Sequence, residues 1–347
     1  MSAPQIPIGD REAVIIGTGS AVPRRIVTNA ELSAMLGEDI APFVSGTLGI
    51  EQRHWCGPDE STADLAEEAG RLALEMAGAT PESVDLLIIA TDTPEFVSPA
   101  TSSVVQGRLG LVNAGTFDLN AGCAGFVTAL DVAWKYLCAD ERYRRVLVIG
   151  AYAMSKYLDQ HDKKTVTIFA DGAGAALVEV QPRTGSPRGI LASELFADGR
   201  YCHGMGIFAG GTRTPITPIV LEQGIQNKLR FVQKYPASVN EEGWPRIVRS
   251  VLGRIGATPA DVDLWLWTQV NRSTIVQVMR TLEQPLARAH TIMQKWGYTG
   301  SACLPMALDD AVRTGVVRDG QLLVFTGSGA GLAMGSVAMR WASTGPG

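Results

Sequence analysis

Short apolar runs alternate with amphipathic stretches along this chain. The runs predict buried strands at residues 13–17, 87–90, 146–150, 265–268 and 322–327. A longer stretch, residues 62–77, follows Ser61, carries apolar side chains at helical spacing and stops at Gly78, so we expect a helix there. Strands that alternate with helices are typical of an α/β fold, with parallel-rich sheets and helices on their faces.

One segment of the chain occurs twice. Residues 79–86 read ATPESVDL, and residues 257–264, 178 positions later, read ATPADVDL. The same offset sets Gly122-Cys123-Ala124 against Gly300-Ser301-Ala302. Two matches in one register indicate a duplicated βαβ unit, so we expect two similar halves, residues 1–180 and 181–347.

The segment that joins the two halves differs in composition. Residues 182–220 are rich in Gly, Pro and Thr, which predicts an extended connection or a cover over the active site. The stretch that follows, about residues 221–255, has an amphipathic pattern and is predicted to be helical.

Composition excludes several classes of function. The chain has 347 residues, 46% of them hydrophobic, which is enough for a large core. Its net charge of −5 argues against a nucleic-acid binder. The five cysteines and four histidines lack the spacing of a zinc site, and no metal is expected. The absence of a signal-like start or a long apolar run predicts a soluble, cytoplasmic protein that does not enter a membrane.

The most reactive feature of the sequence is a cysteine at a strand-to-helix turn. The strand-like residues 116–119 lead into Asn120-Ala121-Gly122-Cys123, and a helical pattern follows. A helix N-terminus favours the thiolate form of a cysteine, although a free cysteine more often only fills space in a core. The glycines on either side of Cys123 favour a nucleophilic role for it over a space-filling one. The second copy of the turn carries Ser301 in place of the cysteine.

Four motifs together resemble those of one family. They are residues 118–126, DLNAGCAGF; residues 49–54, GIEQRH; residues 169–175, FADGAGA; and Gly327-Ser328-Gly329-Ala330-Gly331 with Gly335-Ser336. The chain resembles the β-ketoacyl-ACP synthase III family of the thiolase-like superfamily. The resemblance implies a duplicated, five-layered α-β-α-β-α fold and a homodimer. It also implies an acyl thioester on Cys123, with acyl-CoA or acyl-carrier protein as substrate and no cofactor.

The sequence departs from this family at two catalytic positions. Where the family has a histidine, the chain reads Thr268-Gln269-Val270-Asn271, and where it has an asparagine, the chain has Tyr298. A threonine hydroxyl and a phenol each donate one hydrogen bond but provide no cationic donor. Losing one such donor costs roughly 2.7–4 kcal/mol of transition-state stabilisation. We therefore expect an acyltransferase that passes the acyl group from Cys123 to an acceptor other than malonyl-ACP, such as an alcohol, an amine or a pre-activated carbon nucleophile.

Five other residues are candidates for the site. The amides of Cys123 and of Ala330, in the turn 329–331, could form an oxyanion hole. His290 could replace the missing base, although a histidine held in a structural hydrogen bond is the more common case. By resemblance, Phe43 lies where the family has a CoA-binding tryptophan, and Asn271 lies near the pantetheine arm. Arg272 is the neighbour of Asn271. We expect fewer contacts to the phosphates of CoA than the family makes, which favours a carrier protein over CoA as the acyl donor.

Two other functions fit the same residues. The chain could be a decarboxylating β-ketoacyl-ACP synthase III that uses Thr268 and Tyr298, or His290, as substitute groups. It could also be a non-catalytic ketosynthase partner subunit, although the retained Cys123 speaks against that role. An oxidoreductase has little support, because Gly17-x-Gly19 lacks the third glycine of a dinucleotide-binding motif.

Overall fold

Two sheets form the frame of the protein. The computed structural model describes residues 10–183, 185–223, 226–233, 235–236 and 238–342. The first sheet has the order β1-β7-β6-β4-β5 and the second has the order β11-β12-β13-β8. Strand bounds in the first sheet are β1 Arg11–Ala21, β4 Leu86–Ala90, β5 Gly115–Leu119, β6 Arg145–Ala153 and β7 Asp171–Pro182. Those in the second are β8 Gly189–Ala197, β11 Leu264–Trp267, β12 Leu322–Gly329 and β13 Ala333–Arg340.

Two short, two-stranded antiparallel sheets lie outside this frame. They pair β2 (Arg25–Thr28) with β3 (Gln52–Trp55) and β9 (Met205–Ile207) with β10 (Leu229–Phe231). The helices are α1 Asn29–Leu36, α2 Ala41–Phe43, α3 Thr62–Ala77, α4 Thr101–Leu109, α5 Gly125–Ala139, α6 Lys163–Val166, α7 Pro218–Glu222, α8 Ser238–Gly253, α9 Arg272–Thr281, α10 Met293–Trp296 and α11 Cys303–Arg313.

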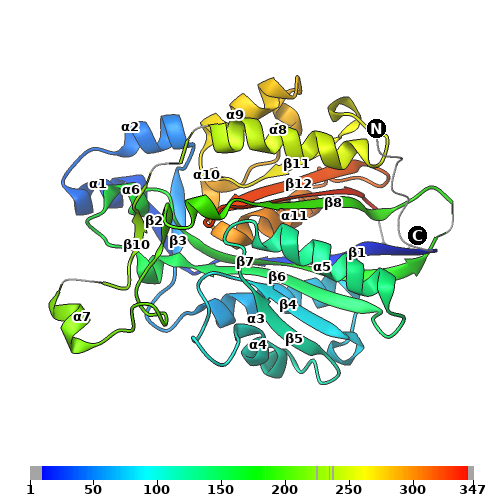
Figure 1. The fold of residues 1–347 in the computed structure, drawn as a ribbon, viewed down its shortest axis with the longest axis horizontal. Coiled ribbons are helices and arrows are strands. Elements are labelled where there is room, and N and C mark those ends of the chain that lie inside the picture. Colours follow the sequence, from blue (N-terminus) through cyan, green and yellow to red (C-terminus); the bar gives the residue numbers. More distant parts are fainter. Residues whose placement is uncertain (1–9, 184, 224–225, 234, 237, 343–347) are drawn as a thin grey trace.

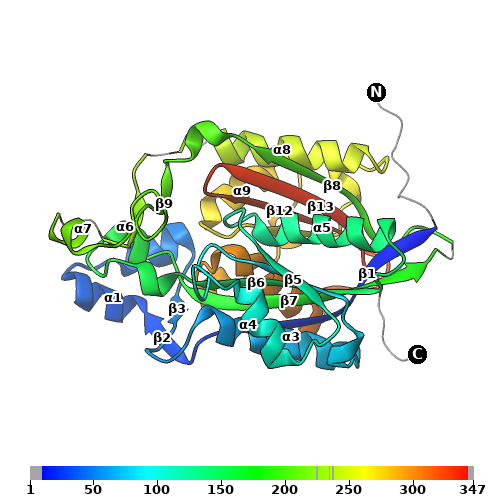
Figure 2. The ribbon, with the colours of Figure 1, turned by 60° about the horizontal axis from the view of Figure 1, so that its bottom comes forward.

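The sheets and helices stack in five layers (Figures 1 and 2). α3 packs on the outer face of the first sheet and against α4. α5 and α11 lie in the middle and contact strands of both sheets. α8 covers the outer face of the second sheet and packs against α9. The expected α-β-α-β-α order is therefore confirmed.

The internal repeat is visible in the structure. The 3₁₀ turn Pro81–Ser83 before β4 has its counterpart in Pro259–Asp261 before β11. The central helices correspond as well, because α5 begins at Gly125 and α11 begins at Cys303. The copies differ between these elements: β5 has no full counterpart in the second sheet, where a single bridge joins Trp265 to Ala289. The duplicated architecture predicted from the sequence is confirmed.

The segment between the sheets corrects two predictions. Residues 182–220 are not only an extended connection, because β8 occupies Gly189–Ala197. This strand forms one edge of the second sheet and pairs with β13. Residues 221–255 are not one helix, since β10 and irregular chain precede α8. Glycine and proline between the elements hid the strand. The boundary predicted at residue 180 falls within β7 and stays a prediction.

Three stacked indoles lie in the core of the second half. Trp265 and Trp267 point to the same face of β11, because they are two residues apart. Their ring centroids are 5.3 Å apart and the ring planes differ by 3°. Trp244 of α8 stacks on Trp267 at the same centroid distance. The stack fixes α8 against the strand that leads into Thr268.

Candidate active site

Cys123 lies at the turn between β5 and α5, as predicted. The Gly125 amide donates to the Gly122 carbonyl oxygen at 2.9 Å, and the Ala124 amide donates to the Ala121 carbonyl oxygen at 3.2 Å. Gly122 has a φ of +53°, a conformation that L side chains rarely adopt. The Asp118 carboxylate, on β5, accepts hydrogen bonds from the Thr101 and Ser102 amides at 2.7 Å each. It therefore caps the N-terminus of α4. These contacts fix the turn and place the thiol beyond the carboxyl end of β5.

The charge state of Cys123 differs from the prediction. The side chain is only 3% exposed. Burial raises the pKa of the Cys123 thiol well above its ordinary value, and the nearby Asp92 carboxylate raises that pKa further. The expectation that the helix N-terminus favours the thiolate is therefore wrong for the free protein. Desolvation outweighs the helix, and attack by the sulfur requires a group that takes its proton.

Thr268 follows β11 and lies beside the start of α5. Its backbone amide donates to the Thr326 carbonyl oxygen at 3.0 Å, and its hydroxyl oxygen accepts from the Ser328 amide at 3.1 Å. A Cβ added to Gly327 would lie 3.1 Å from Thr268 Oγ1 and 3.3 Å from the Ala124 Cα. The structure thus brings Thr268 next to the residue that follows Cys123.

Tyr298 lies within reach of the Cys123 sulfur. Its backbone is held on both sides, because Tyr298 N donates to the Ile168 carbonyl oxygen at 3.1 Å and Ala170 N donates to the Tyr298 carbonyl oxygen at 2.8 Å. Burial raises the pKa of the phenol, and the nearby Cys123 sulfur raises it further. The hydroxyl is placed to stabilise a thiolate, but the two groups are not aligned as a hydrogen bond, and Tyr298 Oη has no aligned partner in the described part of the chain.

The turn that contains Ala330 packs directly on the cysteine turn. A Cβ at Gly329 would lie 2.3 Å from the Cys123 amide nitrogen. A Cβ at Gly122 would lie 2.9 Å from the Ala330 amide nitrogen. Only glycine at these two positions allows such a close approach, and it brings together the two amides expected to form the oxyanion hole. Their role in binding an oxyanion stays a prediction.

His290 is engaged elsewhere. Its ring Nε2 lies 2.8 Å from Asp310 Oδ2 on α11, and Lys295 binds the other oxygen of the same carboxylate. Its backbone amide donates to the Trp265 carbonyl oxygen at 3.0 Å. Among the residues that the structure describes, His290 forms no hydrogen bond or ion pair with Cys123, Thr268 or Tyr298. The geometry is that of a structural histidine held between β11 and α11.

The predicted entrance residues gather around one junction. The turn after α2 packs against the N-terminal end of α9, where a Cβ at Gly49 would lie 3.1 Å from the Cβ of Arg272. Phe43 is 51% exposed beside this turn. Asn271 begins α9, because its Oδ1 accepts from the Thr274 amide at 2.8 Å. That helical role accounts for Asn271 without a substrate, so its contact with pantetheine stays a prediction.

Asp92 was missed in the sequence analysis. It follows Thr91 at the carboxyl end of β4, which pairs in parallel with β5 and β6. Its Oδ1 atom is buried and has no hydrogen-bond partner among the described residues. Burial raises its pKa to about 6. The signal in the sequence was a single acidic residue just after a wholly apolar strand, at the edge of the sheet where Cys123 also lies.

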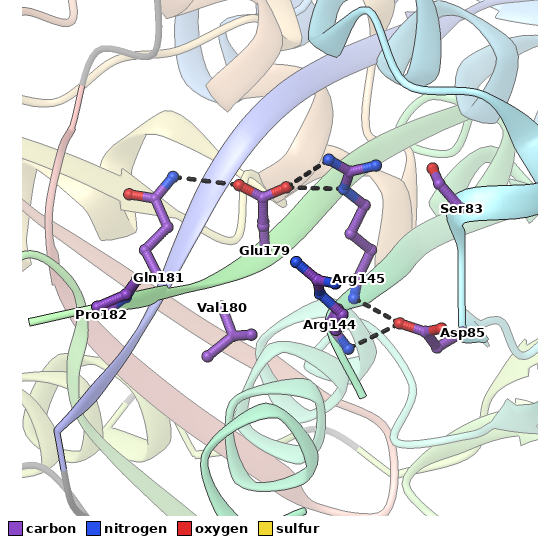
Figure 3. A pocket seen from close by; sticks show the side chains of 8 residues that line it. All are labelled: Ser83, Asp85, Arg144, Arg145, Glu179, Val180, Gln181 and Pro182. Atoms are coloured by element: carbon purple, nitrogen blue, oxygen red, sulfur yellow. Dashed lines mark hydrogen bonds and ion pairs between the residues drawn. The ribbon is translucent and has the colours of Figure 1, made fainter. Parts of the chain in front are cut away.

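A cavity of about 520 Å³ lies at the opposite edge of the first sheet (Figure 3). It is lined at the amino ends of β4 and β6 and at the end of β7. Its polar groups largely bind one another: Arg145 pairs with Glu179, and the Asp85 carboxylate accepts from the Arg144 and Arg145 amides. Ligands of such sheets bind beyond the carboxyl ends of the strands. The cavity therefore lies apart from Cys123 and its chemistry.

The part of the chain that the structure describes holds neither a cluster of metal-binding side chains nor a membrane-spanning helix. No group of three or more His, Cys, Asp or Glu side chains in that part of the chain is arranged to hold a metal ion. None of the described helices is both long enough and apolar enough to cross a bilayer.

The chain is similar to many synthases of one kind. The family described as 3-oxoacyl-[acyl-carrier-protein] synthase III matches residues 117–199, and its C-terminal part matches residues 252–341. A β-ketoacyl-[acyl-carrier-protein] synthase III of Rhizorhabdus wittichii is 38% identical over 95% of this chain and all of its own. Acetoacetyl CoA synthase NphT7 of a Streptomyces species is 36% identical, over 94% of this chain and 98% of its own.

A solved structure extends this similarity to the fold. The 3-oxoacyl-(acyl carrier protein) synthase III of Pseudomonas aeruginosa superposes with a TM-score of 0.87 at 33% identity, covering 96% of this chain and all of that one. Sequence and fold agree along nearly the whole length, and this chain belongs to the 3-oxoacyl-[acyl-carrier-protein] synthase III family.

Proposed function

We propose that this ketosynthase-III-type enzyme takes an acyl group as a thioester on Cys123 and passes it to an acceptor other than malonyl-ACP. One observation carries the proposal: at the two positions where the family has a histidine and an asparagine, this chain has Thr268 and Tyr298, and among the described residues no histidine forms a hydrogen bond or ion pair with Cys123. A threonine and a phenol can orient an acceptor by hydrogen bonds. Neither side chain is a cationic hydrogen-bond donor or a donor with a pKa near 7. Such a donor would stabilise the enolate that forms when a malonyl group loses carbon dioxide.

The acylation step uses groups that lie at the cysteine turn, together with a base that takes the proton of the thiol. The thiol gives its proton to a base, the sulfur attacks the thioester carbonyl, and the Cys123 and Ala330 amides hold the developing oxyanion; the bond from the acyl carbon to the donor sulfur then breaks, and the donor leaves as a thiol after taking up that proton. The donor is acyl-CoA or an acyl-carrier protein, and no cofactor takes part. The exposed Phe43 and Arg272 support a donor that enters between α2 and α9.

Assembly and location follow from the same proposal. We expect a homodimer, and the free edge of β5, which ends the first sheet, supports it. Light scattering after gel filtration would test this. We also expect a cytoplasmic enzyme of fatty-acid or polyketide-type specialised metabolism.

A decarboxylating condensation is the second candidate. It is favoured by the similarity to enzymes named as β-ketoacyl-ACP synthase III and to an acetoacetyl CoA synthase. One assay separates the two candidates: the enzyme is incubated with an acyl donor and malonyl-CoA or malonyl-ACP, and carbon dioxide release is measured. Robust release that depends on the acyl donor would overturn the non-malonyl proposal.

Intact-mass spectrometry tests the shared first step. After exposure to a panel of acyl-CoA and acyl-carrier donors, the protein should gain one acyl mass that is absent from a Cys123→Ala variant. If no donor gives an adduct, the third candidate, a non-catalytic partner subunit, would replace the proposed function.

A further inference from the structure

Asp92 is fixed at the edge of the sheet where the chemistry takes place. The Thr91 amide donates to the carbonyl oxygen of Leu119, the last residue of β5, at 3.0 Å. On the other side, the amide of Ala153, at the end of β6, donates to Thr93 Oγ1 at 2.9 Å. The loop that carries Asp92 is therefore held between the strands on either side of β4. A Cβ at Gly125, two residues after Cys123, would lie 3.0 Å from the Ala90 Cβ, two residues before Asp92.

The carboxyl group has an unusual environment for a structural residue. Its Oδ1 atom is buried and accepts no hydrogen bond from any described group, unlike Asp118 and Asp171, both of whose carboxylate oxygens have partners. A buried polar atom without a partner costs free energy, and such groups need an explanation. Tyr298 Oη is a second buried atom without an aligned partner, and both residues lie near the Cys123 sulfur.

We propose that Asp92 is the general base of acyl transfer and carries the proton of the acceptor to the Cys123 sulfur. This inference rests on the proposed function. As the acceptor attacks the acyl carbon, its bond to hydrogen breaks and the proton moves to the Asp92 carboxylate. The new bond to the acyl carbon forms, the bond between that carbon and sulfur breaks, and the leaving thiolate takes the proton from Asp92. Both the carboxylate and the thiol are restored without any further reactant.

The basicity of Asp92 suits this task. Burial raises its pKa to about 6, so at neutral pH the group is mostly ionised but is a stronger base than an ordinary aspartate. Among the described residues, the Asp92 charge acts on the titratable groups of Cys123, Tyr152 and Tyr157. Burial raises the pKa of each of these, and the Asp92 charge raises each further. None of the three changes charge between about pH 5 and 8, so an inflection near pH 6 would report Asp92.

The base also narrows the class of acceptor. An alcohol, an amine, a thiol or a carbon acid must lose a proton to react, and each of them needs a base. A malonyl group needs none, because loss of carbon dioxide supplies its carbanion. Its own carboxylate would also be repelled by the Asp92 carboxylate in a site of low dielectric. The acceptor that this site fits is a neutral molecule with a proton on the attacking atom.

The test uses the Asp92→Asn variant, which keeps the shape of the side chain and removes its basicity. Protein loaded with acetyl groups from acetyl-CoA or acetyl-carrier protein is mixed with N-acetylethanolamine or N-acetylcysteamine, which are both neutral, and the decay of acetyl-Cys123 is followed by intact mass from pH 5 to 8. The unaltered enzyme should discharge faster as the pH rises through about 6. Asp92→Asn should discharge about 10²–10⁴-fold more slowly and without that inflection.

Two further variants complete the design. Asp92→Glu keeps a carboxylate and should retain part of the rate and the inflection. Asp59→Asn makes the same chemical change at an exposed carboxylate before α3 and should behave as the unaltered enzyme.

The possible results separate the base from the proposed function. If Asp92→Asn discharges at the unaltered rate, or more slowly but with the inflection kept, Asp92 is not the base, although acyl transfer through Cys123 stands. If the unaltered enzyme takes up no acetyl group from either donor, the proposed function fails and this inference fails with it.

Discussion

The hydroxyl oxygen of Thr268 accepts a hydrogen bond from the backbone amide of Ser328, with 3.1 Å between Oγ1 and N. Both residues are buried, and they join the end of β11 to the end of β12. A histidine could not make this contact with the same short side chain. Thr268 therefore stabilises the fold in addition to any role that it has toward an acceptor. Mutations can separate its contribution to stability from its contribution to activity.

Replacing Thr268 by valine should weaken the fold. Valine has the same shape but leaves the buried Ser328 amide without a partner, which costs roughly 1–3 kcal/mol of the free energy of unfolding. Thr268→Ser keeps the oxygen and serves as the control. Urea unfolding of both variants checks the expectation, and equal stabilities would show that the hydrogen bond contributes nothing.

Replacing Tyr298 by phenylalanine should have the opposite effect on stability. The buried hydroxyl has no aligned partner, so its removal should leave the unfolding free energy unchanged or raise it by up to about 1–3 kcal/mol. Discharge of acyl-Cys123 should become slower, because a donor at the reacting sulfur is lost. Thermal unfolding and single-turnover mass spectrometry measure the two effects. A less stable Tyr298→Phe variant would mean that the hydroxyl is bound in the free enzyme.

The Asp92→Asn variant should become more stable than the unaltered protein as the pH rises. The folded-state pKa of Asp92, about 6, lies above its ordinary value of 3.8. The folded state thus favours the protonated form, and stability is lost as the pH rises from about 4 to about 6, where the unfolded chain ionises more readily than the folded one. Asparagine never ionises. The difference in unfolding free energy should be near zero at pH 4 and approach about 3 kcal/mol at pH 8. A difference that does not depend on pH would contradict the assigned burial.

A β-carbon at Gly329 should prevent acylation of Cys123. The added atom would lie 2.3 Å from the Cys123 amide nitrogen, and neither backbone can give way without moving the two amides apart. Gly107→Ala in α4 is the matched control, because nothing lies within 4 Å of the added carbon, and it should stabilise the helix by about 0.5–1 kcal/mol. Intact mass after exposure to an acyl donor gives the result. Full acylation of Gly329→Ala would exclude the proposed oxyanion hole.

Thiol reagents should modify Cys202 before Cys123. Among the five cysteines only Cys202 is exposed, and burial holds the Cys123 thiol in its unreactive protonated form. One equivalent of an aromatic disulfide at pH 8 should therefore label Cys202 and leave acylation intact. A Cys202→Ser variant should show only slow labelling. Rapid loss of acylation in that variant would mean that the thiol of Cys123 is more accessible or more acidic than the structure indicates.

Pattern alone predicted the frame of the protein. The repeat at a spacing of 178 residues placed the paired turns, strands and central helices, because both copies kept the turn residues and the apolar spacing that direct the same local structure. The helix α3 has the predicted bounds, since Ser61 and Asp64 form the capping contacts and Gly78 ends it in the left-handed conformation. Local chemistry of this kind can be read from neighbouring residues.

The environment of the site could not be predicted in the same way. The sequence suggests an acidic Cys123 and gives only the position of Asp92 after an apolar strand, not its burial, because a pKa depends on how much solvent the whole fold removes. His290 lies eight residues before Tyr298 in sequence, but its ring pairs with Asp310 on another element. β8 was hidden in a glycine-rich and proline-rich stretch, since its stability comes from pairing with the distant β13.

The stacked indoles of Trp244, Trp265 and Trp267 should give the enzyme an intrinsic spectroscopic signal. Chromophores this close and nearly parallel couple electronically, so the near-ultraviolet circular dichroism should carry a strong signal from the second half of the chain. Trp267 directly precedes Thr268, and the signal therefore originates one residue from the candidate site. Binding of an acceptor could be observed by spectroscopy in the unmodified protein, without attaching any dye.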